Sequence, residues 1–402
     1  MNRLYEVESN SSSFVVANGR VLMANGDVSK ASIRVENGRI AGVGSHAKAA
    51  DMLDAAGAYV VPGLIDIHTH GIGREKASGD LRAYAAQEAA RGTTTFFPTF
   101  FGPPNETADH LRRHLKETDL LRQVPQVGGF RLESPYLAAA AGGLSRDLAP
   151  ISQGLTDMLL KAGEGHIRIW DVSPEMAGVP EAIRYLTKQG IICSLAHTQA
   201  TIDQARAAVD AGARLVTHLF DTFVLPGGID PDPGVYPAGL IDYLLVEDRV
   251  VCEIIPDGTH VDPILVEKAF RCKPSAGLVF VTDSNYGAGL PPGEYPLPGG
   301  WGLAKINGPN NGVRLVDRKM GLCGSALTPI DCFRNAVKLF GKDLGTASRV
   351  CSRNQSLLLG LNKGEIKAGR DADLLVLDKE LNVLYTIVAG QIIYRHGSTV
   401  HG

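Results

Sequence analysis

The sequence predicts a (β/α)₈ barrel accompanied by a small β-sandwich domain. Three observations in its 402 residues lead to this prediction. Short β-prone runs occupy both ends of the chain, strand-like and helical patterns alternate through its middle, and eight strand-like runs occur in that middle part. The composition is that of a globular chain, with 44% hydrophobic and 21% charged residues, which excludes intrinsic disorder.

The two ends of the chain share one pattern, in which β-prone runs are broken by turn-forming residues. At the N-terminus the breaks are Asn-Gly pairs, namely Asn18-Gly19, Asn25-Gly26 and Asn37-Gly38. Because both residues tolerate positive φ, each pair predicts a hairpin turn. At the C-terminus the runs are 373–378, 383–388 and 391–394. We therefore predict one discontinuous β-sandwich domain from residues 1–59 and 356–402, with the barrel at 60–355.

The middle of the chain contains eight apolar runs of strand length, separated by helical patterns. They are Val60–Ile67, Thr93–Pro98, Val127–Glu133, Ile167–Val172, Ile191–Ala196, Arg214–Leu219, Val250–Ile255 and Leu278–Asp283. Between the fifth and sixth runs, Thr201 and Gln204 form a capping box that predicts the start of a helix. Such alternation is typical of parallel strands joined by helices, and eight of them fit a closed barrel.

Charge and hydropathy restrict the class of partner. The 40 Lys and Arg residues against 43 Asp and Glu residues give a net charge of −3. This balance offers no field for nucleic acid or an anionic membrane, so a small molecule is the expected partner. The N-terminus lacks the apolar core of a signal peptide, and a cytoplasmic protein is expected. The six cysteines form no CxxC pair, which argues against a disulfide framework or a thiolate metal site.

Polar residues that bind metals or transfer protons stand at the ends of the predicted barrel strands. His68 and His70 end the first run, and residues two apart on a strand point to the same side. The ends of later runs carry Glu133, His197, His218 and Asp283. Because the C-terminal ends of barrel strands face one mouth, we expect these side chains to meet there around a cation.

Nitrogen and oxygen ligands without thiolates suit zinc, with iron or manganese as alternatives. Such an ion lowers the pKa of a bound water to about 7 and polarises a carbonyl, so hydrolysis at a carbonyl is the expected reaction. Asp283 is the candidate acid and base, and His260 the candidate contact for the substrate carbonyl. Arg131 shares a strand side with Glu133, and it either reaches the mouth or is a packing or salt-bridge residue.

The motifs in this order resemble those of the amidohydrolase superfamily, and within it the N-acetylglucosamine-6-phosphate deacetylases. The resemblance is carried by 61–71, 91–95, 132–135, 196–198, 215–219, 255–260, 278–283, 289–294, 324–328 and 369–374. It implies a principal metal ion on Glu133, His197 and His218, and a second ion on His68 and His70. It also implies Asp283 as catalytic acid and base, His260 at the scissile carbonyl, and a homodimer.

The residues expected to bind the substrate depart from the family pattern. Arg131 stands where the family has His in His-Leu-Glu-Gly-Pro, and Ser145 lies near the place of a further expected histidine. Asp221 and Thr222 replace the Asn and Ala that help to hold the sugar phosphate. The loop 224–239 contains no Arg or Lys to neutralise a phosphate. Arg131 or Arg146 is the expected replacement for the missing positive charge.

Three functional hypotheses follow. The first is a metal-dependent deacetylase of N-acetylglucosamine 6-phosphate or a related N-acetyl amino sugar, with His260, Asp221, Thr222, Arg131 and Ser145 binding the substrate. The second keeps the same chemistry but acts on an unphosphorylated N-acyl compound. The third is a barrel that binds metal without catalysis, and the complete set of ligands and the acid–base carboxylate argue against it.

Overall fold

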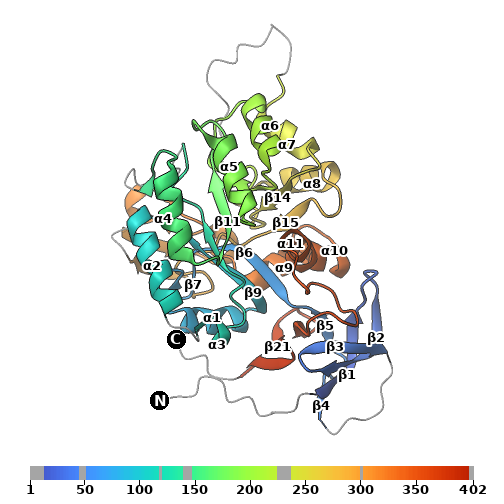
Figure 1. Ribbon diagram of the computed structural model, residues 1–402. Helices are drawn as coiled ribbons and strands as arrows, with labels where there is room; N and C mark the ends of the chain where they lie inside the picture. The colour runs from blue at the N-terminus through green and yellow to red at the C-terminus, as the bar shows by residue number, and fades with distance from the viewer. Residues whose placement is uncertain are drawn as a thin grey trace.

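The computed structural model describes residues 13–44, 51–116, 120–138, 147–223, 237–298 and 302–397. Its centre is a sheet of eight parallel strands, all of which were predicted (Figure 1). They are β6 (Leu64–Thr69), β9 (Thr93–Phe100), β10 (Phe130–Leu132), β11 (Ile167–Val172), β12 (Ile192–Leu195), β13 (Leu215–Val216), β14 (Val251–Ile254) and β15 (Leu278–Phe280). Each strand pairs with the next in chain order, which is the topology of a (β/α)₈ barrel.

Backbone hydrogen bonds between the first and last strands bring the barrel close to closure. Asp283 N donates to His68 O at 2.9 Å, and His70 N donates to Ser284 O at 2.8 Å. Thr69 and Ser284 also form an isolated parallel bridge. Because these bonds join β6 to the segment after β15, they place the His68 and Asp283 ends of the two strands side by side.

Helices cover the outside of the strands (Figure 1). They are α1 (Leu81–Ala90), α2 (Pro104–Lys116), α3 (Leu120–Gln123), α4 (Gln153–Gly163), α5 (Val179–Lys188), α6 (Ile202–Ala211), α7 (Leu240–Val246), α8 (Pro263–Cys272), α9 (Pro329–Lys338), α10 (Leu344–Ser348) and α11 (Asn354–Leu359). The predicted capping box is present at the start of α6, where Thr201 and Gln204 bond each other's backbone N–H groups. Among the residues that the structure describes, no helix combines the length and hydropathy needed to cross a membrane.

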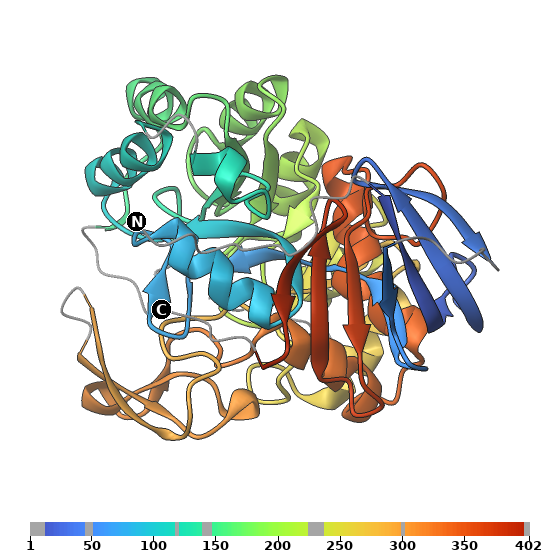
Figure 2. The ribbon, with the colours of Figure 1, turned by 90° about the horizontal axis from the view of Figure 1, so that it is seen from below.

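Strands from both chain ends form a second, mixed sheet beside the barrel (Figure 2). They are β1 (Ser13–Leu22), β2 (Val28–Glu36), β3 (Arg39–Gly44), β4 (Met52–Asp54), β5 (Tyr59–Pro62), β20 (Leu374–Leu377), β21 (Val383–Val388) and β22 (Gln391–Arg395). Alternate residues of β20 face different cores, since Leu374 and Val376 join the sheet's own cluster while Leu375 and Leu377 join the barrel's. The expected union of the two termini is confirmed, as one continuous sheet.

Two details of the sequence prediction are corrected here. The run predicted as one strand at Val60–Ile67 is divided at Gly63, because β5 pairs with β1 and β20 while β6 enters the barrel. The terminal sheet therefore extends to Pro62. Asn18-Gly19 is not a hairpin turn but a bulge within β1, where Asn18 has φ 57° and the register with β2 shifts. The hairpin turn at Asn37-Gly38, with φ of 49° and 76°, is confirmed.

Two small antiparallel sheets stand at the mouth of the barrel. One is the hairpin of β7 (Gly71–Ile72) and β8 (Glu75–Lys76), which follows directly after β6. The other contains β16 (Gly293–Leu297), β17 (Gly302–Ile306), β18 (Arg314–Leu315) and β19 (Gly321–Leu322). Both contribute residues to the wall of the cavity described below.

Candidate metal centre and active site

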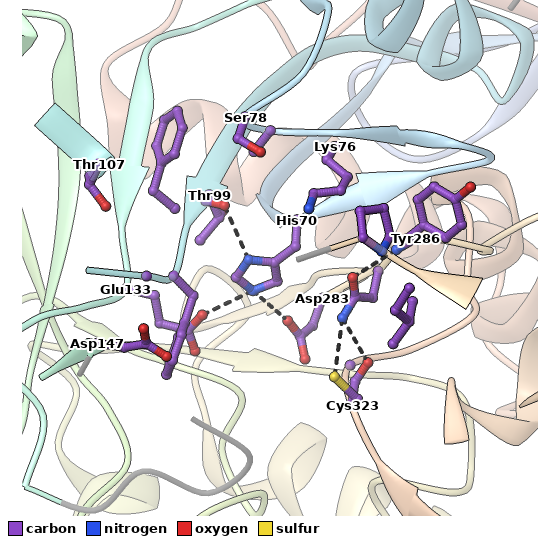
Figure 3. Close-up of a pocket in the computed structure, with 18 of the residues that line it drawn as sticks. His70, Lys76, Ser78, Thr99, Thr107, Glu133, Asp147, Asp283, Tyr286 and Cys323 are labelled. Carbon is purple, nitrogen blue, oxygen red and sulfur yellow. Dashed lines mark hydrogen bonds and ion pairs between the residues drawn. The ribbon is translucent and has the colours of Figure 1, made fainter. Parts of the chain in front are cut away.

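Six of the predicted polar side chains come together at the C-terminal ends of the barrel strands. They form two groups, and within each group the ligand atoms all lie within 4.8 Å of one another. One group is His68, His70 and Asp283, and the other is Glu133, His197 and His218. His68 is the next-to-last residue of β6, and the other side chains come from the first few residues after the ends of their strands. Figure 3 shows His70, Glu133 and Asp283 converging from three separate elements.

The backbone turns sharply where these side chains leave the strands. His197, His218 and Asp283 have φ of 42°, 25° and 46°, in the left-handed region that is unfavourable for residues with a Cβ. Such strain is kept only where the surrounding structure imposes it, and it is common at functional sites. The three strands therefore end in a conformation that directs these side chains into the barrel mouth.

The two groups are in direct contact through Glu133. His70 Nε2 lies 2.9 Å from Glu133 Oε2 and 3.2 Å from Asp283 Oδ1. On the other side, His197 Nε2 lies 2.8 Å and His218 Nε2 3.4 Å from Glu133 Oε1. The Nε2 atoms of His68 and His70 are 3.3 Å apart. Four imidazoles thus surround one buried carboxylate, with a second carboxylate at the edge.

The charges of these groups perturb one another strongly. Burial disfavours the charged form of His70, but the charge of Glu133 and hydrogen bonds to Asp283 and Glu133 raise its pKa to about 10. Burial likewise opposes charge on His218, while its bond to Glu133 raises its pKa to about 10. For Asp283, burial favours the neutral form, but the charge of His68 and the bond to His70 lower its pKa to about 2.

This donor set fits a divalent cation. The carboxylates require positive charge beside them, and a cation supplies it in place of imidazolium protons. His197 Nδ1 is buried and has no hydrogen-bond partner among the residues that the structure describes, whereas Nε2 faces Glu133 at 2.8 Å. The donors are nitrogen and oxygen without sulfur, which suits zinc, iron or manganese.

Arg131 does not line the cavity, so the prediction that it contacts the substrate is corrected. The structure instead agrees with the second interpretation, a salt-bridge residue. Its side chain is fully buried, and its partner Glu253 also contacts His68. Nη1 donates to Glu253 Oε1 and to Ile67 O, and Nη2 donates to Asp171 Oδ2 at 3.0 Å and to Thr217 Oγ1 at 3.0 Å. With this many acceptors inside the barrel, the guanidinium is held away from the mouth.

Glu253 and Asp171 were not predicted from the sequence. Glu253 lies in β14 and its Oε2 is 3.1 Å from His68 Nδ1, so it holds a metal-site histidine from behind. Asp171 lies in β11 and pairs with Arg131. The signal that could have revealed them is a charged residue within an otherwise apolar barrel strand, because burial there requires a partner of opposite charge.

His260 lies in the loop after β14, where the sequence places it. Its Nδ1 is 2.6 Å from Asp257 Oδ2, and its backbone N–H donates to Asp257 Oδ1. Burial lowers the pKa of His260, but the hydrogen bond and charge of Asp257 outweigh this and raise it above the usual value. An aspartate at Nδ1 fixes the ring and leaves Nε2 available to a ligand.

The two groups open into a cavity of about 360 Å³. One part of its wall comes from β8, the segment after it and α2, and another from the loops that follow β13, β14 and β15. The first part includes Lys76, Ser78, Glu106, Thr107 and His110, and the second includes Asp221, Thr222, His260, Asn285 and Tyr286. Asp221 and Thr222, which are expected to bind the substrate, line the cavity, and Ser145 and Arg146 lie outside the described residues.

Comparison with known proteins agrees with this architecture. The model of the amidohydrolase family matches residues 59–393. The N-acetylglucosamine-6-phosphate deacetylase of Danio rerio is 32% identical over 356 residues, covering 85% of this chain and 86% of that protein. The N-acetylgalactosamine-6-phosphate deacetylase of Escherichia coli is 30% identical over 385 residues, covering 93% and 97%.

Among solved structures, an N-acetylglucosamine-6-phosphate deacetylase variant from Mycobacterium smegmatis, in complex with N-acetylglucosamine 6-phosphate, superimposes with a TM-score of 0.83. It is 28% identical, and the match covers 95% of this chain and all of that chain. The family match, the relatives and the shared fold lead to one conclusion: this chain belongs to the amidohydrolase family.

Proposed function

We propose that this enzyme removes the acetyl group from N-acetylglucosamine 6-phosphate or a closely related N-acetyl amino sugar. The single observation that carries the proposal is the position of Asp283, whose Oδ1 lies 3.3 Å and 3.2 Å from the Nε2 atoms of His68 and His70 in the cavity that His260 also lines. This arrangement combines an acid–base carboxylate, a set of metal donors and a polar contact for a carbonyl. The activities of the Danio rerio and Escherichia coli relatives support the choice of substrate.

The proposed metal ligands are Glu133, His197 and His218 for a principal ion, and His68 and His70 for a second. When bound, a divalent ion such as zinc lowers the pKa of water and polarises the substrate carbonyl. The donor chemistry supports zinc, iron or manganese, and a metal analysis of the purified protein will distinguish them.

Asp283 is the proposed acid and base. Positive charge beside it favours the ionised carboxylate, which can accept a proton from the water that attacks the acetamide carbon. A carbon–oxygen bond forms, and the carbon–nitrogen bond then breaks. Asp283 returns the proton to the departing nitrogen, so the products are acetate and the free amine.

His260 is the proposed donor to the carbonyl oxygen. Because Asp257 accepts a hydrogen bond from Nδ1, the imidazolium form is favoured and Nε2–H can donate to the oxygen as negative charge develops on it. This donor is buried and fixed before the substrate binds, which makes it more effective than a mobile one.

The proposal is tested by measuring acetate release from N-acetylglucosamine 6-phosphate by protein loaded with each metal. Asp283→Asn is expected to lower kcat by about a hundred- to ten-thousandfold. Asp203→Asn, on the exposed face of α6, is the matched control and is expected to retain activity. Near-normal turnover by Asp283→Asn would overturn the assigned role, and no turnover of any N-acetyl amino sugar by metal-loaded protein would overturn the function.

A second candidate is the hydrolysis of an unphosphorylated N-acyl compound by the same residues. The observation in its favour is Asp221, an acidic residue that lines the cavity where the family resemblance expects an amide. A carboxylate there repels a phosphate dianion. Comparing hydrolysis of N-acetylglucosamine with and without its 6-phosphate separates the two candidates.

A homodimer completes the proposal and is supported by the family resemblance alone. Sedimentation of the metal-loaded protein will test it. A monomer at micromolar concentration would contradict it.

A further inference from the structure

We propose that Lys76 is the anion-binding residue of the cavity, and that the substrate carries a phosphate or carboxylate group which this ammonium pairs with. The inference rests on the proposed function, because it concerns the substrate of the same site. The inference places the anionic group of the substrate beside the β7–β8 hairpin, which follows His70, and not on the side of the cavity that Asp221 lines.

Lys76 is fixed next to a metal-site histidine by its backbone. It ends β8, where it pairs with Gly71, the residue after His70. Ala77 N donates to His70 O at 2.9 Å, and Gly71 N donates to Ser284 O at 3.1 Å. A side chain at Gly71 would meet Glu75 O at 2.7 Å, so the hairpin is closely packed. Figure 3 shows Lys76 beside His70 at the cavity.

The segment after Lys76 is held by α2. His114 Nε2 donates to Ala77 O at 2.9 Å, and Arg113 Nη2 donates to Ser78 O. Ser78 and Thr107 line this part of the cavity and carry hydroxyl groups that can donate to an oxyanion. The lysine therefore stands in a preformed setting that also offers neutral donors.

The ammonium of Lys76 has no partner among the residues that the structure describes, although the side chain is partly buried. By contrast, the ammonium groups of the buried Lys273 and the partly buried Lys363 are paired: Lys273 Nζ donates to Glu247 O at 2.8 Å, and Lys363 Nζ to Asp373 Oδ2 at 2.7 Å. Burial alone lowers the pKa of Lys76. An unpaired, partly desolvated cation is costly, and an anionic ligand would remove that cost.

Lys76 is also the sole lysine or arginine among the described residues that line the cavity. Of the two predicted sources of positive charge, Arg131 is committed to Glu253 and Asp171 inside the barrel, and Arg146 lies outside the described residues. Glu106 lines the cavity too, but it is exposed, and no ion pair joins it to Lys76 within the described ranges. Solvent screens the charge of Glu106 more than that of the partly buried lysine.

Two pairs of substrates test the inference, each with an anionic and a neutral member. One pair is N-acetylglucosamine 6-phosphate and N-acetylglucosamine, and the other is N-acetylalanine and N-acetylalaninamide. For metal-loaded protein, the preference is the ratio of kcat/KM for the anionic member to that for the neutral member. Lys76→Gln is expected to reduce this ratio by about ten- to a hundredfold, mainly through KM, for the pair whose anion reaches Lys76.

Lys76→Arg keeps the charge and is expected to retain most of the preference for the anionic member of the pair. A purely structural role for Lys76 would not require the charge to preserve this preference. Lys188→Gln, an exposed lysine at the end of α5, is the matched control. A ratio unchanged in Lys76→Gln for both pairs would overturn the inference. A reduced ratio for the phosphate pair alone or the carboxylate pair alone supports it and identifies the anion.

Calorimetry separates failure of the inference from failure of the proposed function. The same four compounds are titrated into metal-loaded Asp283→Asn protein, with and without Lys76→Gln. Preferential binding of the anionic members that depends on Lys76 supports the inference even where no turnover is found. If the enzyme hydrolyses a pair of substrates but binds the anionic and the neutral member equally well, the inference is contradicted and the proposed function remains intact.

Discussion

Glu253 and His68 form a buried contact behind the candidate metal centre, with Glu253 Oε2 3.1 Å from His68 Nδ1 and both side chains wholly excluded from solvent. The carboxylate accepts from Nδ1–H, so the Nε2 lone pair of His68 faces His70 and Glu133. The same Oε2 atom accepts the backbone N–H of His218 at 3.3 Å. One carboxylate thereby orients residues of both metal-site groups.

Glu253→Gln is expected to weaken metal binding at His68 and His70 by about ten- to a hundredfold, because the neutral amide holds the ring less firmly and makes it a weaker donor. The measurement is metal stoichiometry after dialysis against buffers of known free metal concentration. Glu181→Gln, on the exposed side of α5, is the control. Unchanged stoichiometry and affinity in Glu253→Gln would show that the contact does not orient the ligand.

Arg131→Leu is expected to destabilise the fold by about 3 to 5 kcal/mol, since it leaves the buried carboxylates of Glu253 and Asp171 without their partner. Denaturant unfolding of the metal-free protein measures the loss. The exposed Arg184→Leu is the control and is expected to change stability by less than about 1 kcal/mol. Equal stability of the two variants would mean that the buried network is not needed for folding.

The clustering of the candidate metal ligands was predictable from the sequence because their position follows from a local rule. His68, Glu133, His197 and Asp283 each stand where an apolar run ends, and parallel strands all end at one rim. The Arg131–Glu253 pair could not be found in this way. Its members are 122 residues apart and lie inside strands, where no local pattern indicates which distant residue will lie opposite.

The missed strand division has a different physical cause. Apolar residues continue from β5 into β6 on both sides of Pro62-Gly63, so the hydropathy of the run does not indicate a change of sheet. In the structure, a Cβ at Gly63 would lie 2.2 Å from the side chain of Thr94. The glycine is required for this close approach between strands, a tertiary contact that the sequence pattern does not reveal.

Asp257→Asn is expected to shift the alkaline limb of the pH profile of kcat/KM to lower pH. In the wild-type protein, Asp257 raises the pKa of His260, so the imidazolium donor persists to higher pH. Without that charge the pKa falls, and the donor is lost earlier as the pH rises. Steady-state rates across the pH range measure the shift. An alkaline limb that stays in place, with only a uniform loss of rate, would show that His260 does not act in the charged form.

Glu88→Gln is expected to remove a pH dependence of stability. Glu88 is fully buried in α1, where it accepts from Thr93 Oγ1 at 2.6 Å, and its Oε1 has no hydrogen-bond partner within the described part of the chain. Burial, with the nearby charge of Asp66, raises its pKa from 4.5 to about 8. The folded protein therefore binds more protons than the unfolded chain between these values, and its stability falls as the pH rises through that window. Unfolding free energies of the wild-type and variant proteins, measured at both ends of the window, test this. The wild-type protein should lose more stability than Glu88→Gln on going to the higher pH, and equal losses would mean that Glu88 titrates normally in the fold.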